Sequence, residues 1–161
     1  MRVAGAWREN RFELDGAFTV EQVSAVRRLL ERLHRTGANH EMLSRVSIAA
    51  HELFENAVKF SSDGFASIRV DVVAPHRVLI TTRNRALAEN LVALRAMAAR
   101  LQQGSRDMMG VYLDLMQQAP RARGGLGIGR VAAEAEMAVD VELDGDLVVV
   151  RAVMALEGEA A

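Results

Sequence analysis

Residues 39–60 carry two parallel stripes of side chains, and this stretch constrains the fold more than any other. The apolar stripe alternates spacings of three and four residues, which is the period of a helix with one buried face; its members are Leu43, Val46, Ala50, Leu53, Ala57 and Phe60. Glu52, Asn56 and Lys59 follow the i, i+4, i+7 relation and form a second stripe, about a quarter to a third of a turn away. The pattern predicts a long helix whose shoulder forms the wall of a cleft.

A plain surface helix is the alternative interpretation of the polar stripe. Glu55 and Lys59 are an i, i+4 pair in the favourable orientation, and such pairs add about 0.3–0.5 kcal/mol to many solvated helices. Helix geometry alone therefore leaves both a binding wall and a solvated face open.

The composition limits the classes of function. The chain has 161 residues, which suits one domain, 1–161, with a sizeable core. A net charge of −1 without a basic block gives no support for nucleic-acid binding. The absence of cysteine excludes disulfides, thiolate catalysis and cysteine-ligated zinc. No signal peptide and no apolar run of about 20 residues is evident, so we expect a cytoplasmic protein without membrane contact.

Periodicity along the rest of the chain predicts alternating helical and strand segments. Short alternating runs indicate strands at residues 12–16, 66–72, 78–82, 137–143 and 147–153. Helical spacing indicates further helices at about residues 19–36, 87–101 and 129–135. Thr19 and Gln22 fit a capping box at the start of the first of these helices, Gly37 is expected to end it, and Asn39 can cap the next helix. Residues 61–64, Ser-Ser-Asp-Gly, are expected to break the helical pattern, and turns are expected at residues 74–76 and at Asp144-Gly145. The order predicts a two-layer α/β sandwich in which helices pack on one face of a mixed, mostly antiparallel sheet. The last apolar strand, 147–153, is expected to be central.

A cluster of glycines precedes the last predicted helix. The sequence Gly-Gly-Leu-Gly-Ile-Gly occupies residues 124–129. Glycines at the start of a helix leave backbone N–H groups unhindered at the positive end of the helix dipole, where a phosphate can bind. A simple turn is the alternative, and the glycine pattern alone does not decide between them.

These two motifs together resemble the GHKL ATPase superfamily. The predicted order of elements resembles its fold over a domain core from about residue 11 to 156. Glu-x-x-x-Asn-Ala-x-Lys at residues 52–59 is similar to the family's N-box, and residues 124–129 are similar to its second glycine box. The resemblance implies that Glu52 is catalytic and that Asn56 binds Mg²⁺. It also implies that ATP phosphates lie near Lys59 and the glycine box, at Gly125, Leu126, Gly127, Ile128 and Gly129.

The sequence departs from the family at the adenine end of the site. ATP-binding members carry Asp-x-Gly-x-Gly, whereas residues 81–86 here read Thr-Thr-Arg-Asn-Arg-Ala. Arg83 at the position of the Asp would set a donor against the adenine amino group and lose a charge-assisted hydrogen bond of about 1.5–3 kcal/mol. Thr82 and Asn84 are the alternative acceptors.

The resemblance within the superfamily is greatest to the anti-sigma factor serine/threonine kinases of bacterial partner switching. It implies a signalling regulator that phosphorylates or sequesters a small protein of the antagonist or receiver type, and a homodimer formed through the first strand and helix. The loss of the adenine-binding Asp leaves a second hypothesis open, a degenerate scaffold that binds its partner without nucleotide.

Overall fold

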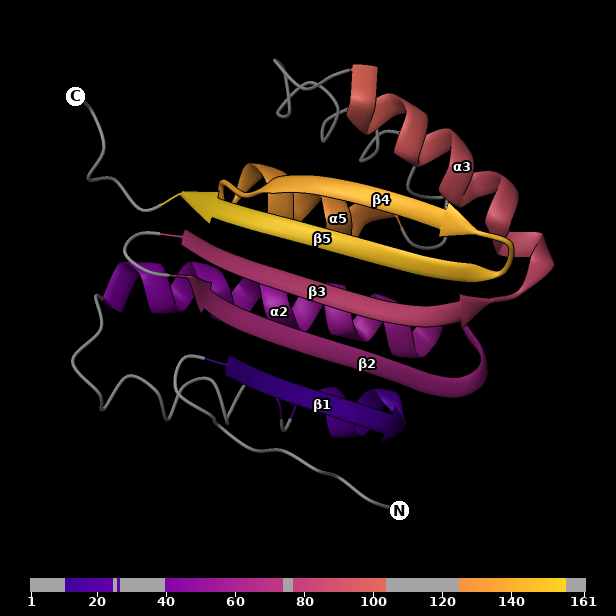
Figure 1. Ribbon diagram of the computed structural model, residues 1–161, viewed down its shortest axis with the longest axis horizontal. Helices are drawn as coiled ribbons and strands as arrows, with labels where there is room; N and C mark the ends of the chain where they lie inside the picture. Colours follow the sequence, from indigo (N-terminus) through magenta and orange to yellow (C-terminus); the bar gives the residue numbers. More distant parts are fainter. Residues whose placement is uncertain (1–10, 25, 27–39, 74–76, 104–124, 156–161) are drawn as a thin grey trace.

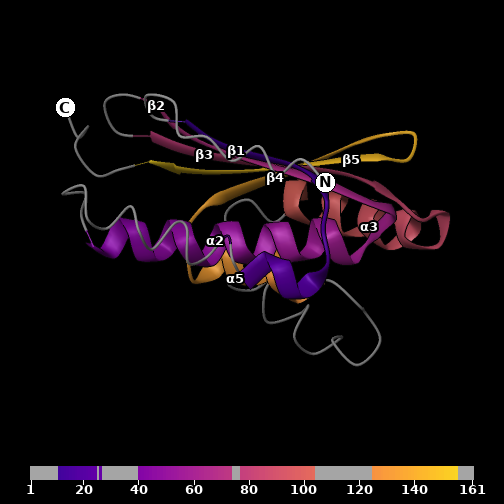
Figure 2. The ribbon, with the colours of Figure 1, turned by 90° about the horizontal axis from the view of Figure 1, so that it is seen from below.

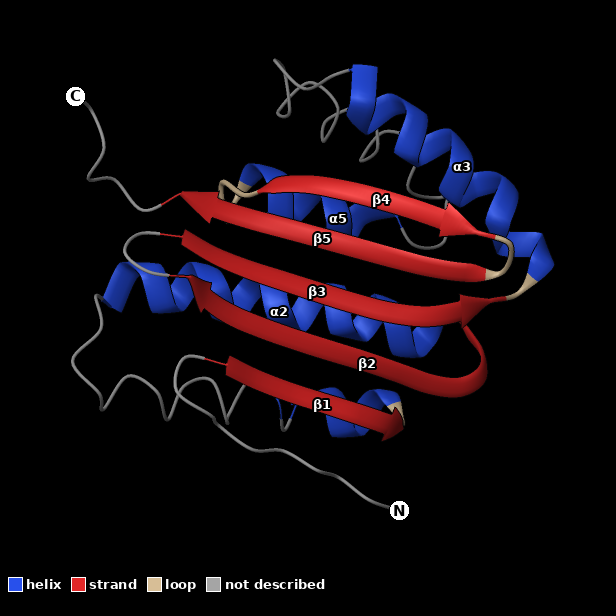
Figure 3. Ribbon diagram, viewed as in Figure 1, coloured by secondary structure: helices blue, strands red, loops and turns tan. Residues whose placement is uncertain are grey.

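The five strands that the structure describes form one antiparallel sheet (Figures 1 and 3). The computed structural model describes residues 11–24, 26, 40–73, 77–103 and 125–155. Within them the strand order is β1-β2-β3-β5-β4, and every neighbouring pair is antiparallel. The strands are β1 Arg11–Ala17, β2 Ser61–Val73, β3 Arg77–Ala86, β4 Ala138–Asp144 and β5 Leu147–Ala155.

The described helices lie on one side of this sheet, as Figure 2 shows edge-on. They are α2 His40–Lys59, α3 Ala88–Gln103 and α5 Gly125–Ala133, and residues 20–24 and 26 are also helical. None of them covers the opposite side of the sheet. The predicted two-layer sandwich is therefore confirmed.

The core lies between the sheet and α2, where the apolar faces of the strands pack on the apolar stripe of the helix. Alternate residues of β3 are buried from Val78 to Ala86, while the residues between them face the other side of the sheet. On α2, Leu53 is 1% exposed and Phe54 0% exposed. Five members of the predicted apolar stripe are buried, namely Leu43, Val46, Ala50, Leu53 and Ala57.

The start of β2 differs from the prediction. We expected the Ser-Ser-Asp-Gly segment at residues 61–64 to break the pattern before a strand, but β2 already begins at Ser61. The register shifts between Ser61 and Ala66, and Gly64 adopts φ 76°. The Asp63 carboxylate accepts hydrogen bonds of 2.9 Å from the Ser61 hydroxyl and from the Phe65 N–H. The segment is thus a bulge within a strand, held by its own side chains.

The ends of two other elements agree with their turn and cap signals. Thr19 N–H donates to Gln22 Oε1 at 3.0 Å, which is one of the two bonds of the predicted capping box. Gln22 N–H donates to the backbone carbonyl of Thr19, also at 3.0 Å, and not to its hydroxyl. Gly145 and Asp146 form the turn between β4 and β5, with Gly145 at φ 61°. The middle strand of the sheet is β3. The strand that was predicted to be central, β5, is an interior strand beside β3, one position from the middle.

Several predicted features lie outside the described residues. They are the helix stop at Gly37, the Asn39 cap, the turn at residues 74–76 and the segment between α3 and α5. Among the described residues, no helix is both long and apolar enough to cross a membrane.

Candidate functional site

The shoulder of α2 lies directly against α5, and this junction brings the two sequence motifs together. Glu52 and Asn56 are half-buried side chains, one helical turn apart on α2. A Cβ built on Gly127 of α5 would lie 3.0 Å from Glu52 Oε2 and 2.5 Å from Asn56 Nδ2. The carboxylate and the carboxamide therefore touch the glycine helix itself.

Contrary to the expectation from the sequence, the glycines of residues 125–129 do not form a loop before the helix. They belong to α5, which begins at Gly125. A glycine inside a helix costs about 1 kcal/mol relative to alanine, so its presence here needs a packing reason. Gly127 has one, because any side chain at that position would collide with Asn56. The physical role of Gly127 is thus to let α2 and α5 approach closely.

The predicted glycine-box positions take different places in α5. Gly125 and Leu126 lie in its first turn. Gly127 and Gly129 are buried, and Ile128 is 3% exposed within the hydrophobic core. Ile128 can therefore offer a ligand only its backbone.

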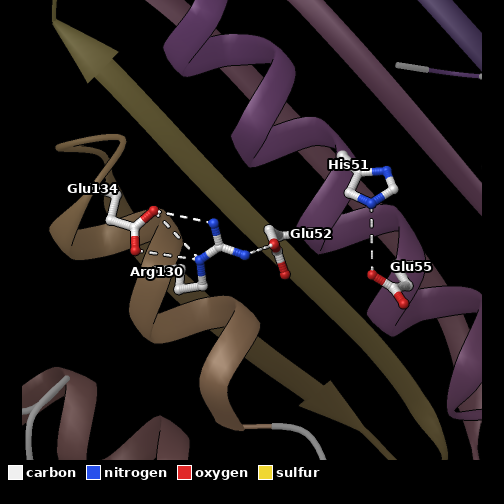
Figure 4. Close-up of polar contacts among 5 residues, drawn as sticks. All are labelled: His51, Glu52, Glu55, Arg130 and Glu134. Atoms are coloured by element: carbon white, nitrogen blue, oxygen red, sulfur yellow. Dashed lines mark hydrogen bonds and ion pairs between the residues drawn. The ribbon is translucent and has the colours of Figure 1, made fainter. Parts of the chain in front are cut away.

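Arg130 completes the junction, although the sequence analysis gave it no role. Its Nη1 donates to Glu52 Oε1, while Nη2 and Nε contact the Glu134 carboxylate at 3.1 and 3.3 Å (Figure 4). The Glu52 side chain is only 15% exposed, against 42% for Arg130. The spacing of Arg130 and Glu134 by four residues signals a pair at the end of α5, but the link to Glu52 depends on tertiary packing and has no sequence signal.

Asn56 has a buried amide group without a visible acceptor. Its Nδ2 has no hydrogen-bond partner among the residues that the structure describes. An unpaired buried donor costs about 1–3 kcal/mol, so such groups in native proteins call for an explanation, and an absent ligand is one. This atom therefore marks a position where an acceptor oxygen would be stabilising.

No hydrogen bond or ion pair joins Lys59 to this cluster among the described residues. It ends α2 with an exposed side chain, and its Nζ lies 5.5 Å from the centre of the Phe60 ring. His51 also points away from α5, towards Glu55, with 3.7 Å between Nε2 and Oε2 (Figure 4). The junction thus consists of Glu52, Asn56, Gly127 and Arg130.

The expected obstruction by Arg83 at the adenine end is wrong. Side chains alternate along β3, and Arg83 is exposed on the side of the sheet opposite the helices. Thr82 and Asn84 face the helices instead, 1% and 8% exposed. The residues that could meet a base are therefore an alcohol and a carboxamide, both of which can accept a hydrogen bond.

The described part of the chain offers no clustered metal ligands. No three His, Asp or Glu side chains converge within it. A magnesium ion at the junction would therefore take one carboxamide oxygen from Asn56 and the rest of its shell from phosphates and water, as Mg²⁺ often does.

Comparison with known proteins shows a likeness in structure. No family model and no curated protein sequence matches the chain. A chain in the crystal structure of the SiaB–SiaC complex from Pseudomonas aeruginosa matches with a TM-score of 0.64 and 15% sequence identity, over 88% of this chain and 89% of that chain. At this identity the likeness shows a shared fold over nearly the whole length.

Proposed function

We propose that this chain is a partner-switching signalling regulator of the GHKL type that phosphorylates a small regulatory protein. The observation that carries the proposal is the contact between the N-box residues of α2 and the glycine helix α5. This contact joins a carboxylate, a carboxamide and backbone amides at the start of a helix, the groups needed to hold a triphosphate and its metal.

The residues at the junction fit Mg²⁺-ATP at its phosphate end. Asn56 can ligate the metal through Oδ1, and its unpaired Nδ2 can donate to a phosphate oxygen. The first-turn N–H groups of α5, at Gly125, Leu126 and Gly127, have no acceptor within their own helix. Bound Mg²⁺-ATP would supply the phosphoryl group and neutralise its charge.

Glu52 is the candidate base for the transfer. In this proposal the hydroxyl oxygen of a partner serine or threonine bonds to the γ-phosphorus as the bond to the bridging oxygen breaks, and the hydroxyl proton passes to Glu52. Arg130 has to release this carboxylate before it can accept a proton. Glu134 holds the same guanidinium from the other side, so the release leaves Arg130 with a charged partner.

A protein partner has separate support. The matched structure is a complex of two proteins, so a chain with this fold is found there in a protein–protein assembly. This supports a small protein as the substrate or target of the present chain.

A nucleotide-independent scaffold is the second candidate. It is favoured by the Arg130–Glu52 ion pair, which already neutralises the carboxylate, and by the lack of an Asp on the helix-facing side of β3. A scaffold would use the junction for rigidity and bind its partner elsewhere.

Isothermal titration of the full chain with ATP separates the two candidates. We expect binding that requires Mg²⁺ and is weakened at least about tenfold in Asn56→Ala, the loss expected for a metal ligand and a charge-assisted contact. Asn90→Ala, at a half-buried asparagine of α3, is the matched control and should bind as the wild type does. A wild-type chain that binds no ATP with Mg²⁺ would refute the kinase and leave the scaffold.

A further inference from the structure

A pocket of about 270 Å³ lies on the open face of the sheet, which is the side opposite the helices. None of the described helices covers this face (Figure 2). The pocket lies where β1, β2, β3 and β5 run side by side, and the side chains that line it include Asp15, Phe65, Ser67, Arg83, Arg85 and Leu147. It is therefore built by the register of the sheet, and it shares no residue with the α2–α5 junction.

Two charges of this pocket are not neutralised. Asp15, Ser67 and Arg83 stand in one row on β1, β2 and β3, because Asp15 pairs in register with Ser67 and Ser67 with Arg83. Two strand spacings separate the acid from the base by about 10 Å, which is too far for an ion pair. Both are exposed, and neither has a charged partner among the described residues.

The neighbouring charges are already paired and do not compete for this row. Arg85 bonds Asp146 at 2.6 Å, and Arg69, the next open-face residue of β2, bonds Glu13 at 3.0 Å. Such cross-strand pairs are the usual arrangement of charges on a sheet. A free carboxylate and a free guanidinium on opposite sides of one pocket therefore favour a ligand that carries both charges.

An exposed aromatic ring stands beside the row. Phe65 is 57% exposed and lies two residues from Ser67 on the same side of β2, about 7 Å along the strand. The Asp63 carboxylate accepts from the Phe65 N–H, and the Ser61 hydroxyl donates to the Phe65 carbonyl, both at 2.9 Å. These bonds fix the backbone that carries the ring and also occupy the Asp63 carboxylate.

We propose that this pocket binds a zwitterionic α-amino acid with a bulky apolar side chain. The ligand's ammonium group would bind Asp15, and its carboxylate would bind Arg83 with the Ser67 hydroxyl beside it. Its side chain would pack on the Phe65 ring. An anion alone would leave Asp15 facing a like charge, and a cation alone would do the same at Arg83, so both fit the pocket less well.

The size of an α-amino acid matches the row. Its ammonium nitrogen lies about 2.5 Å from its carboxyl carbon, and the C–O bond adds about 1.2 Å. A charge-assisted hydrogen bond of about 2.8 Å at each end brings the span to about 9 Å. Side chains stand roughly perpendicular to a sheet, so Asp15 and Arg83 present their charges across a similar distance. The inference does not depend on the proposed kinase activity.

A ¹H–¹⁵N titration of the full chain with L-phenylalanine tests the proposal. We expect a Kd of about 1 mM or tighter, measured from the amides of Ser67 and Arg83. Asp15→Asn and Arg83→Gln should each weaken binding at least about tenfold, and Phe65→Ala about fivefold. Arg77→Gln, an exposed site at the start of β3, is the matched control and should bind as the wild type does.

Ligand analogues test the same contacts in the unaltered chain. N-acetyl-L-phenylalanine lacks the ammonium charge and L-phenylalanine amide lacks the carboxylate, so each should bind at least about tenfold more weakly. Glycine, which has no side chain for Phe65, should also bind more weakly. Circular dichroism of each variant establishes that its fold is retained.

Three results would overturn the proposal. The first is a wild-type chain whose amides do not shift at about 20 mM L-phenylalanine, a concentration that reveals even weak binding. The second is equal affinity for L-phenylalanine and both blocked analogues. The third is binding that Asp15→Asn and Arg83→Gln leave intact. Loss of an identified protein partner in these variants, without amino-acid binding to the wild type, would assign the pocket to that partner instead.

Discussion

The two faces of the sheet use the same strand alternation for opposite purposes. On the covered face, apolar residues pack on α2, and the Glu52 side of the Arg130–Glu52 pair is only 15% exposed. On the open face, which is the side of the sheet opposite the helices, ion pairs such as Arg85–Asp146 have both side chains exposed to water. Contacts of one chemical type are therefore expected to contribute different amounts to the free energy of unfolding on the two faces, and the following experiments measure these differences.

The largest contrast is expected between two phenylalanines. Phe54 is 0% exposed and meets the Phe18 ring edge-on at 5.0 Å between centroids, whereas Phe65 is 57% exposed. We expect Phe54→Ala to lower the free energy of unfolding by about 3–5 kcal/mol and Phe65→Ala by at most about 0.5 kcal/mol. Urea unfolding monitored by circular dichroism, at a concentration where both variants are monomeric, gives both values. Equal losses would contradict the division between the faces.

The α2–α5 contact gives the second contrast. In an open helix, Gly→Ala stabilises by about 1 kcal/mol, but a Cβ at Gly127 would lie 2.5 Å from Asn56 Nδ2. We therefore expect Gly127→Ala to destabilise by about 1–3 kcal/mol. The double variant Gly127→Ala/Asn56→Ala removes the obstacle and should recover most of this loss in the same urea experiment. A stabilising Gly127→Ala would mean that the helices are not in contact there.

Ion pairs on the two faces should differ in the same direction. A double-mutant cycle of Arg130→Ala and Glu52→Ala should give a coupling of about 1 kcal/mol, since Glu52 is only 15% exposed. The cycle of Arg85→Ala and Asp146→Ala should give less than about 0.5 kcal/mol, because side chains exposed by 58% and 50% are screened by water. Salt at 1 M should weaken the second coupling more than the first. The reverse order would contradict the shielding of Glu52.

The smallest effect should come from the bulge on the open face. The hydrogen bond from the Phe65 N–H, followed by that from the Ser61 hydroxyl, lowers the pKa of Asp63 below its usual 3.8. A lowered pKa means that the carboxylate stabilises the fold above its unfolded pKa and loses this contribution as the pH falls through the folded value. The melting temperature should therefore fall slightly less between pH 6 and pH 3 in Asp63→Asn than in the wild type. An unchanged difference would show that the bulge does not depend on the ionised carboxylate.

Much of the fold followed from residues whose role is local. The alternation at Phe12 and Leu14 predicted β1, the apolar stripe from Leu43 to Ala57 predicted α2, and Asp144-Gly145 predicted the last hairpin. For β1 and α2 the period of the pattern matches the period of the backbone, and the hairpin follows from a turn that favours glycine at positive φ. The contact of Glu52 and Asn56 with Gly127 was expected only from the family resemblance, and the roles that the resemblance implies for these residues stay predictions.

The sequence could not show features that depend on tertiary contact. Gly127 was expected in a loop because glycine disfavours helices, and only the Asn56 side chain explains its place in α5. Arg130 reaches Glu52 across 78 residues of sequence, and no local pattern signals such a pair. The side of the sheet on which Arg83 lies could not be predicted from the sequence. It depends on the register of β3, because a shift by one residue exchanges the two faces.

The most direct test of the central claim replaces Mg²⁺ by paramagnetic Mn²⁺ in the nucleotide complex and follows the ¹H–¹⁵N resonances of the full chain. The proposed function predicts that Mn²⁺-ATP broadens the side-chain amide of Asn56 and the backbone amides of residues 52–56 and 125–130 most strongly. The amides of Phe65, Ser67 and Arg83 on the open face should broaden least. Broadening that spares the α2–α5 junction, or that is strongest on the open face, would contradict the account.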